Sequence, residues 1–487
     1  MGRIFLGQEN LEQAASMQTS LEPASLEQTG LEPASQEHIP EHTSIRRQAI
    51  ASYGQAVRIL EQVRRDLLVI DMDIQFSFRD DVEPLYRQYA DALLRSPHPS
   101  NDTLKTATEL IDSLQLAELE NALRCDVDRF LQINQVTVDD HTAVIYPIVL
   151  EDRLEVVLST PHQDLKRHPI PISRTEVESL IDDIQRYLPV ASRRKKSQQL
   201  THQVYEWLIE PWEEDLKVSE DIESSSIDTI VFILDGDLKS IPMAALWDET
   251  RQRYLLERYA IAVAPGLQLV NPKPLERPLR VLAAGTTEAL THPISMRPFA
   301  PLVNVGDEIE RIGEHMPTET LLDQDFTRAE LEGRLGAEAF GVLHLATHGE
   351  FSSDPSRTFV LLNDDPLYAE DLDDILRRKN TQAPIQMIVL SACQTATGDR
   401  RAALGLAGLT LRAGAQSAVA TLWSVEDKSA ATLMQEFYRQ LAEHRDIGRA
   451  EALRRSQLAL WKEAEEYNQD WKAPYFWAPF ILVGNWL

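Results

Sequence analysis

Two short apolar runs in the last third of the chain are each followed by small and polar residues. The first run, 342–346, leads to His348, and the second run, 385–390, leads to Cys393. Short apolar runs that stop at polar residues are typical of buried parallel strands. In open α/β sheets, chemistry is usually carried by the loops at the carboxyl ends of the strands. The pattern therefore predicts two neighbouring strand ends that carry an imidazole and a thiol, a Cys/His dyad.

The alternation of strands and amphipathic helices extends back to about residue 140. Strands are expected at 143–150 and 154–159, joined by the charged turn 151–153 as a hairpin. A further strand at 229–234 ends at Asp235, with neither histidine nor cysteine. We predict an α/β unit that occurs twice, with the dyad only in the later copy. Further strands are expected at 261–264, 279–284, 359–362, 417–422 and 479–484, and helices at 175–188, 198–216, 308–313, 328–334, 368–377, 406–413, 428–441 and 448–462.

The first part of the chain follows other patterns. Residues 1–43 are rich in Glu, Ser, Gln and Pro, a composition that cannot bury enough surface to order itself. From residue 44 apolar side chains recur at helical spacing, and helices are expected at 82–94 and 103–125. The predicted organisation is a disordered acidic tail (1–43), a helical segment (44–139), an inactive α/β subdomain (140–295) and a catalytic α/β subdomain (296–487).

The charge balance and the cysteine count narrow the class of protein. There are 48 basic and 77 acidic residues, a net charge of −29, which argues against nucleic-acid or anionic-membrane partners. No apolar run reaches the roughly 18–20 residues of a membrane helix, and we expect no secretory signal. Two cysteines fit a reducing compartment, most simply the cytoplasm. Cys125, beside Asp126 and Asp128, is predicted to be a packing thiol because nearby acids raise a thiol pKa.

A second histidine lies four residues before His348 and raises the question of a metal. His344 and His348 would share one face only in a helix. In a strand they are about 13 Å apart, and no third ligand is near in the sequence. We therefore predict that His344 is a hydrogen-bonded core residue, with no metal or cofactor. Cys393 alone could be a buried packing thiol, but the histidine motif favours catalysis.

Five motifs occur in order between residues 140 and 487. They are LDGDL at 234–238, LHLATHG at 343–349, LSACQT at 390–395, TLWSV at 421–425 and YFWAPF at 475–480. Together they resemble the CHAT domains, caspase-related cysteine peptidases often found beside tetratricopeptide repeats. The resemblance implies a caspase-like three-layer α/β sandwich, with a pseudo-peptidase first half, related to separases and gingipains. The chain departs from the usual arrangement because it has no 34-residue repeat.

The resemblance also assigns roles. It implies that Cys393 attacks, that His348 carries the proton, and that the backbone N–H groups of Gly349 and Cys393 form the oxyanion hole. A glycine after the histidine lets a substrate backbone approach closely. The implied activity is a cysteine endopeptidase that makes limited cuts in protein substrates and is gated by a regulatory protein partner. The alternative is a catalytically silent CHAT scaffold for protein–protein interactions. A redox sensor at Cys393 would need a resolving cysteine nearby.

The residues around the dyad are the candidates for substrate binding. In caspase-like folds the position two before the cysteine helps to line the pocket for the residue that precedes the cut, and here it is the uncharged Ser391. A preference for a basic side chain would then need an acid from Asp354, Glu426 or Asp427. Each could instead be a surface charge or a helix cap, and Asp427 could cap the helix at 428–441. The candidate set is Ser391, Trp423, Ser424, Asp354, Glu426 and Asp427.

Overall fold

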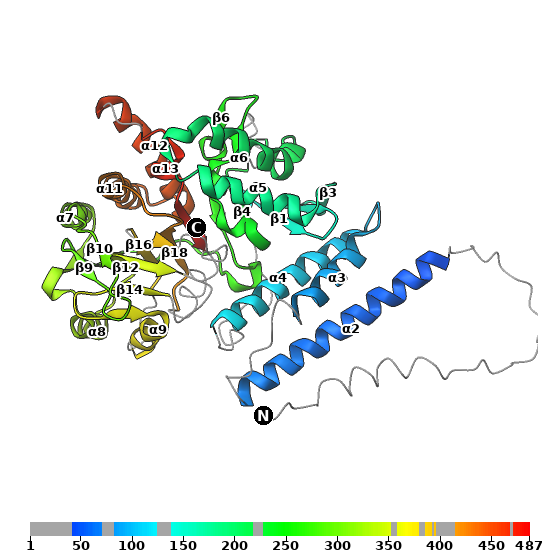
Figure 1. The fold of residues 1–487 in the computed structure, drawn as a ribbon, viewed down its shortest axis with the longest axis horizontal. Helices are drawn as coiled ribbons and strands as arrows, with labels where there is room; N and C mark the ends of the chain where they lie inside the picture. Colours follow the sequence, from blue (N-terminus) through cyan, green and yellow to red (C-terminus); the bar gives the residue numbers. More distant parts are fainter. Residues whose placement is uncertain are drawn as a thin grey trace, which may run out of the picture. The chain divides into compact units, whose positions relative to one another are not determined.

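The protein is described by a computed structural model, shown in Figure 1. The described residues are 41–70, 82–123, 138–217, 227–351, 358–378, 385–391, 394–395, 414–467 and 471–487. Most of the predicted tail and the predicted helix at 406–413 lie outside them. The chain forms two compact units, Met1–Gln48 and Ala49–Leu487. Helix α2, Glu41–Ile70, begins in the first and continues in the second, which holds both α/β halves.

The second unit is a mixed α/β structure built on one large sheet. In the described residues this sheet has 11 strands in the order β11-β8-β12-β16-β18-β19-β7-β4-β1-β2-β3. It is mostly parallel; β2 is antiparallel to both of its neighbours, β1 and β3, and β19 is antiparallel to β18. The bounds are β1 Thr142–Val149, β2 Leu154–Ser159, β3 Lys166–Ile170, β4 Thr229–Phe232, β7 Ala260–Val263, β8 Val281–Gly285, β11 Thr318–Leu322, β12 Val342–Ala346, β16 Met387–Leu390, β18 Ser417–Thr421 and β19 Phe480–Gly484.

Alternating side chains of the later strands enter two separate cores, which makes the second half a three-layer sandwich. Val342 and Ala346 of β12 belong to the core shared with α7 and α11, while Leu343 and Leu345 belong to the core shared with α8 and α9. Figure 1 shows these helix pairs on opposite faces of the sheet. The helices are α3 Glu83–Leu94, α4 Asn101–Leu123, α5 Arg174–Tyr187, α6 Arg194–Leu208, α7 Val305–His315, α8 Arg328–Ala337, α9 Ala369–Arg378, α11 Asp427–Glu443, α12 Arg449–Tyr467 and α13 Pro474–Trp477.

The two halves of the sheet are joined by strand β19. It pairs with β18 on one side and with β7 on the other, where Val483 is opposite Val263. Gly484 has φ +99°, and a Cβ there would lie 2.6 Å from the carbonyl oxygen of Gln416, so only glycine permits this approach. Strand β8 precedes the predicted boundary at residue 296, yet it pairs with β11 and β12, which both follow it.

Short strands outside the large sheet lie beside the dyad motifs. A small sheet has the order β15-β14-β13-β17. A separate hairpin, β9–β10, precedes helix α7. The bounds are β9 Leu290–Thr291, β10 Pro298–Phe299, β13 Gly349–Phe351, β14 Phe359–Leu361, β15 Pro366–Tyr368 and β17 Gln394–Thr395, and a third small sheet pairs β5 Trp247–Asp248 with β6 Arg253–Tyr254.

No helix in the described part of the chain is long and apolar enough to cross a membrane.

Helices α3 and α4 contact the carboxyl end of β4 in the first half of the sheet, where neither a histidine nor a cysteine follows the strand. Arg87 of α3 donates through Nη2 to Oδ1 of Asp235 at 2.7 Å, and Asp235 also accepts the backbone N–H of Val149 at 2.9 Å. Gln115 of α4 donates to the carbonyl of Leu234 at 2.9 Å. Burial alone would raise the pKa of Asp235, but the charge and hydrogen bonds of Arg87 bring it below its usual value. This strand end therefore serves as an anchor for the helical segment.

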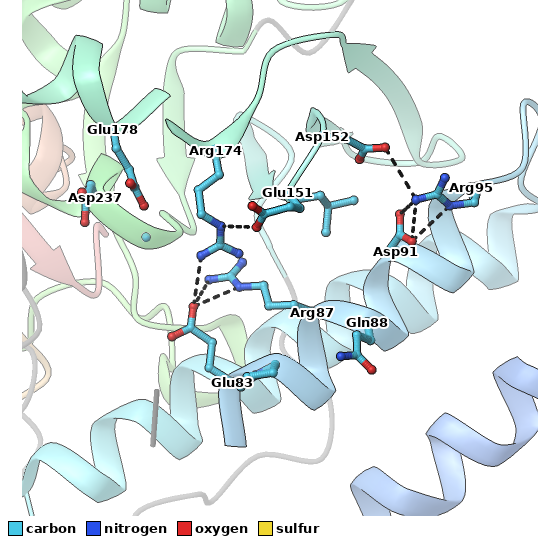
Figure 2. Close-up of a pocket in the computed structure, with 13 residues that line it drawn as sticks. Glu83, Arg87, Gln88, Asp91, Arg95, Glu151, Asp152, Arg174, Glu178 and Asp237 are labelled. Atoms are coloured by element: carbon cyan, nitrogen blue, oxygen red, sulfur yellow. Dashed lines mark hydrogen bonds and ion pairs between the residues drawn. The ribbon is translucent and has the colours of Figure 1, made fainter. Parts of the chain in front are cut away.

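A cleft of about 860 Å³ opens beside this anchor, between α3 and the ends of β1 and β4. Figure 2 shows Arg87 and Arg174 both directed at the carboxylate of Glu83, with Arg174 also near Glu151. Farther along α3, Arg95 pairs with Asp91 at 2.8 Å and is 59% exposed. Helix α3 therefore carries a buried ion pair, Arg87 with Asp235, and an exposed one, Arg95 with Asp91.

Replacing Arg87 by Met is expected to destabilise the protein by roughly 3–5 kcal/mol, because Asp235 would stay buried without its counter-charge. The matched control is Arg95→Met, whose exposed pair is worth less than about 1 kcal/mol. Urea unfolding followed by circular dichroism measures both. Equal losses in the two variants would show that Arg87–Asp235 does not anchor the helices.

Helix α4 also buries a carboxyl group, Asp112, for which the described part of the chain supplies no counter-charge. Asp112 is 7% exposed. Burial raises its pKa to about 7, the backbone hydrogen bond from Leu267 opposes the rise, and the charge of Glu109 adds to it. The folded state therefore keeps this proton up to a higher pH than the unfolded chain does.

The contribution of Asp112 to stability is thus most favourable below about pH 4 and declines as the pH rises to about 7, by up to roughly 4 kcal/mol. Asp112→Asn mimics the protonated side chain, so its stability gain should be near zero at pH 4 and largest at pH 7 and above. Urea midpoints of both proteins from pH 4 to pH 8 measure the gain. A gain that is the same at every pH would contradict this account.

Candidate functional site

His348 is half-buried where β12 ends and β13 begins. Its Nε2 lies 2.6 Å from the carbonyl oxygen of Ala300, and the ring of Phe299 packs against it with 4.9 Å between centroids. A carbonyl oxygen can only accept, so we assign the hydrogen to Nε2. In the neutral imidazole Nδ1 is then the acceptor and the position from which His348 can take a proton.

The surroundings of His348 keep its imidazole neutral near pH 7. Burial lowers the pKa of His348 below its ordinary 6.5, and the nearby charge of Arg297 lowers it further. The hydrogen bond to Ala300 and the charge of Asp427 act in the opposite direction but do not cancel the effect of burial. A neutral imidazole is the form that accepts a proton from a thiol.

Cys393 itself lies outside the described residues, but the chain on both sides of it is described. Ser391 follows β16, which pairs in parallel with β12. Gln394 begins β17 and pairs in parallel with Glu350 of β13. The chain therefore leaves the large sheet next to β12, the strand that leads to His348, and joins the small sheet next to β13, the strand that follows His348. Gly349, the predicted oxyanion donor, is buried as the first residue of β13.

The segment 297–304 contacts three elements around the dyad motifs. At its start, Arg297 pairs with Glu350 of β13 at 3.2 Å. In its middle, Ala300 accepts the hydrogen bond from His348. At its end, the backbone N–H and the side-chain Nδ2 of Asn304 both donate to Oδ2 of Asp427, each at 2.8 Å. The segment thereby connects β13, the end of β12 and the start of α11.

The predicted cap at Asp427 is wrong. Helix α11 starts at Asp427 itself, and its N-cap is Glu426, whose side chain makes no capping hydrogen bond. The carboxylate of Asp427 instead accepts hydrogen bonds from Asn304. It therefore connects the start of α11 to the segment 297–304 rather than capping its own helix.

The other substrate-binding candidates have different surroundings. Ser391 is only 2% exposed, and Ser424 is exposed. Trp423 donates its ring N–H to the carbonyl of Tyr475 at 3.1 Å. The carboxylate of Glu426 accepts the ring N–H of Trp471 at 3.1 Å. Asp354 lies outside the described residues. Of these candidates, the structure brings Asp427 to the segment that holds His348.

His344 is a hydrogen-bonded core residue, as predicted. It is fully buried, with Nδ1 3.0 Å from the hydroxyl of Tyr438 on α11 and Nε2 3.0 Å from Oε1 of Glu308 on α7. Burial and the charge of Glu308 raise the pKa of Tyr438 well above its ordinary value. This buried cluster fixes α7 and α11 against β12. No group of three or more His, Cys, Asp or Glu in the described residues could hold a metal ion.

Sequence reasoning missed Phe299, Ala300 and Asn304. Ala300 acts through its backbone carbonyl, which no residue type signals. Phe299 lies in the two-residue strand β10, which is too short to show a pattern. Asn304 directly precedes helix α7 and could have been noticed as a cap, but its side chain makes no capping bond.

Comparison with known proteins gives a family and a fold. The family model of the CHAT domain matches residues 198–485. The Saccharomyces cerevisiae separase–securin complex is similar with a TM-score of 0.51 and 12% identity, over 92% of this chain and 38% of that chain. The Arg-specific cysteine proteinase gingipain R has a TM-score of 0.35 and 10% identity, over 72% of this chain and 79% of that chain. No curated protein matches the chain.

The chain spans well under half of the separase chain that it resembles. The low identity means that the likeness concerns the fold, a caspase-like α/β arrangement with a large, mostly parallel sheet.

Proposed function

Because the chain belongs to the CHAT domain family, whose model matches residues 198–485, we propose that it is a cysteine endopeptidase that makes limited cuts in protein substrates. The observation that carries the proposal is the hydrogen bond from His348 to Ala300, which leaves Nδ1 as the proton acceptor. Two features support it: the lowered pKa of His348, and the pairing of Gln394 with Glu350 beside Cys393.

In the proposed reaction the thiol of Cys393 gives its proton to Nδ1 of His348. The thiolate then attacks the carbonyl carbon of the peptide bond, and the negative charge that forms on the carbonyl oxygen is stabilised by the N–H groups of Gly349 and Cys393. His348 passes the proton to the leaving amine, and the carbon–nitrogen bond breaks. A water molecule, deprotonated by His348, hydrolyses the thioester, releases the acid and restores the thiol.

The peptide would contact residues from the loops that border this dyad. Asp427 is close enough to His348 for its charge to raise the pKa of the imidazole. Ser424, in the loop that leads to Asp427, is exposed. The remaining proposed contacts are Ser391, Trp423, Glu426 and Asp354.

Regulation by a protein partner and a cytoplasmic location are parts of the same proposal. The separase structure that the chain resembles is a complex with securin, which supports control by a bound protein here. The helical segment 44–139 and the acidic tail 1–43 are the proposed contacts for such a partner. A reducing cytoplasm would keep Cys393 as a free thiol. From the pairing of β8 with β12 we further propose that the catalytic half begins before β8.

An irreversible thiol-reactive peptide should label the full-length protein at Cys393. Labelling should disappear in Cys393→Ala and slow by roughly 10²–10⁴-fold in His348→Ala, because the proton acceptor is lost. Cys125→Ala is the matched control and should label at the rate of the unchanged protein. Mass spectrometry of the intact protein and its peptides measures rate and position.

The assay is run on the isolated protein and on the complex that co-purifies with it from its own cells. Equal labelling of Cys393 in His348→Ala and in the unchanged protein would contradict the dyad. If Cys393 is labelled in neither preparation, the proposed peptidase is contradicted and the silent scaffold is favoured.

A further inference from the structure

We propose that Asn304 is a positioning residue for His348, because its two hydrogen bonds to Asp427 hold the segment that presents the Ala300 carbonyl to the imidazole. The importance of this for peptide cleavage rests on the proposed function. The positioning itself concerns only the orientation of His348.

The bonding of Asn304 is unusual for its position. Asn304 is the N-cap residue of α7, a place where an Asn side chain normally accepts a hydrogen bond from its own helix. Here it makes no such bond. Its Nδ2 and its backbone N–H instead both donate to the same carboxylate oxygen of Asp427, at the start of a different helix. The side chain thus ties the starts of α7 and α11 together.

Both helices are fixed independently at positions farther along. The buried contacts of His344 with Glu308 on α7 and with Tyr438 on α11 hold them against β12, and Arg311 of α7 donates to Gln435 of α11. Asn304 therefore bonds to a rigid frame, and the short segment before it takes its position from that frame.

The segment between Ala300 and Asn304 is only partly packed. Ala300, Pro301 and Val303 are exposed, Val303 to 71%, while Leu302 packs half-buried on the large core and its carbonyl accepts the N–H of Val305. Few buried contacts and an exposed backbone are typical of a segment that opens easily unless its ends are fixed. Pro301 restricts its own φ and the conformation of Ala300 before it, so a shift at one end is passed along the segment. The bond at Asn304 thus controls where the Ala300 carbonyl lies.

The groups on the other side of His348 complete the arrangement. Arg297 lies 4.9 Å above the ring of Phe299, which packs on the imidazole, and pairs with Glu350 on β13. Two charged side chains shift the pKa of His348: Asp427, which accepts from Asn304, raises it, and Arg297 lowers it. Arg297 is itself paired with Glu350. Loss of the Asn304 side chain would leave the Arg297 contact and the backbone N–H bond to Asp427 in place, and would remove one of the two bonds at the Ala300 end.

The test is nitrogen-15 NMR of the histidine side chains in the full-length protein, with the His348 signals identified by their absence in His348→Gln. The unchanged protein should show one tautomer at neutral pH, with the hydrogen on Nε2. In Asn304→Ala the signals should become a mixture of tautomers. The rate of peptide labelling should fall about 10–100-fold, as expected for a misplaced catalytic group.

Two controls separate positioning from charge and from general loosening. Asn101→Ala removes a similar Asn–Asp contact, 2.7 Å from Nδ2 to Asp164, and should leave His348 unchanged. Asp427→Asn keeps an acceptor oxygen for Asn304, so the tautomer should persist while the pKa of His348 falls, because the charge that raised it is gone. Asp427→Ala removes the acceptor of both bonds from Asn304, and it is the second variant in which the contact is broken, whether or not Asn304→Ala folds.

A single Nε2–H tautomer in the variant that breaks the contact would overturn the proposal. This outcome is distinct from failure of the peptidase assignment, because the NMR measurement needs neither a substrate nor a reactive Cys393. If positioning is confirmed and Cys393 stays unlabelled, only the proposed function fails.

Discussion

The hydrogen bond from Nε2 of His348 to the Ala300 carbonyl is the constraint on which the site depends. An imidazole can serve a thiol only if one nitrogen is unprotonated and faces it, and this bond decides which nitrogen that is. Burial keeps the ring neutral, so the acceptor is available near pH 7. The carbonyl comes from a segment distant in sequence, which the contact of Asn304 with Asp427 connects to the start of α11.

The two halves of the large sheet use their strand ends differently. In the second half the strand ends lead to His348 and Cys393. In the first half the strand β4 leads to Asp235, whose carboxylate holds Arg87 of the helical segment. A position that could have carried chemistry is occupied by a buried ion pair. The helical segment is thus attached to the same continuous sheet that supports the dyad motifs, and β19 joins the two parts.

Strands that contain an apolar run could be predicted from the sequence, even the three-residue β14, and polar strands such as β3 and β11 could not. The hairpin of β1 and β2, the strand that precedes His348 and the buried role of His344 are all confirmed. Strands β13 (GEF) and β17 (QT) were missed because they contain no apolar run, although they bring the flank of Cys393 to the strand after His348. Asp427 was taken for a cap because a local rule applied, while its partner Asn304 is 123 positions away in sequence. Contacts of that kind arise from tertiary packing, which a local pattern does not encode.

The pH dependence of Cys393 alkylation by a small neutral reagent measures whether His348 and Cys393 act as a pair. If the neutral imidazole of His348 faces the thiol, the rate should rise with a midpoint below 6.5, the ordinary value for histidine from which the pKa of His348 is lowered. In His348→Ala the midpoint should move to about 8.5, the value of an unassisted thiol. A midpoint near that of a free thiol in the unchanged protein, with no change in His348→Ala, would show that the two side chains do not act together.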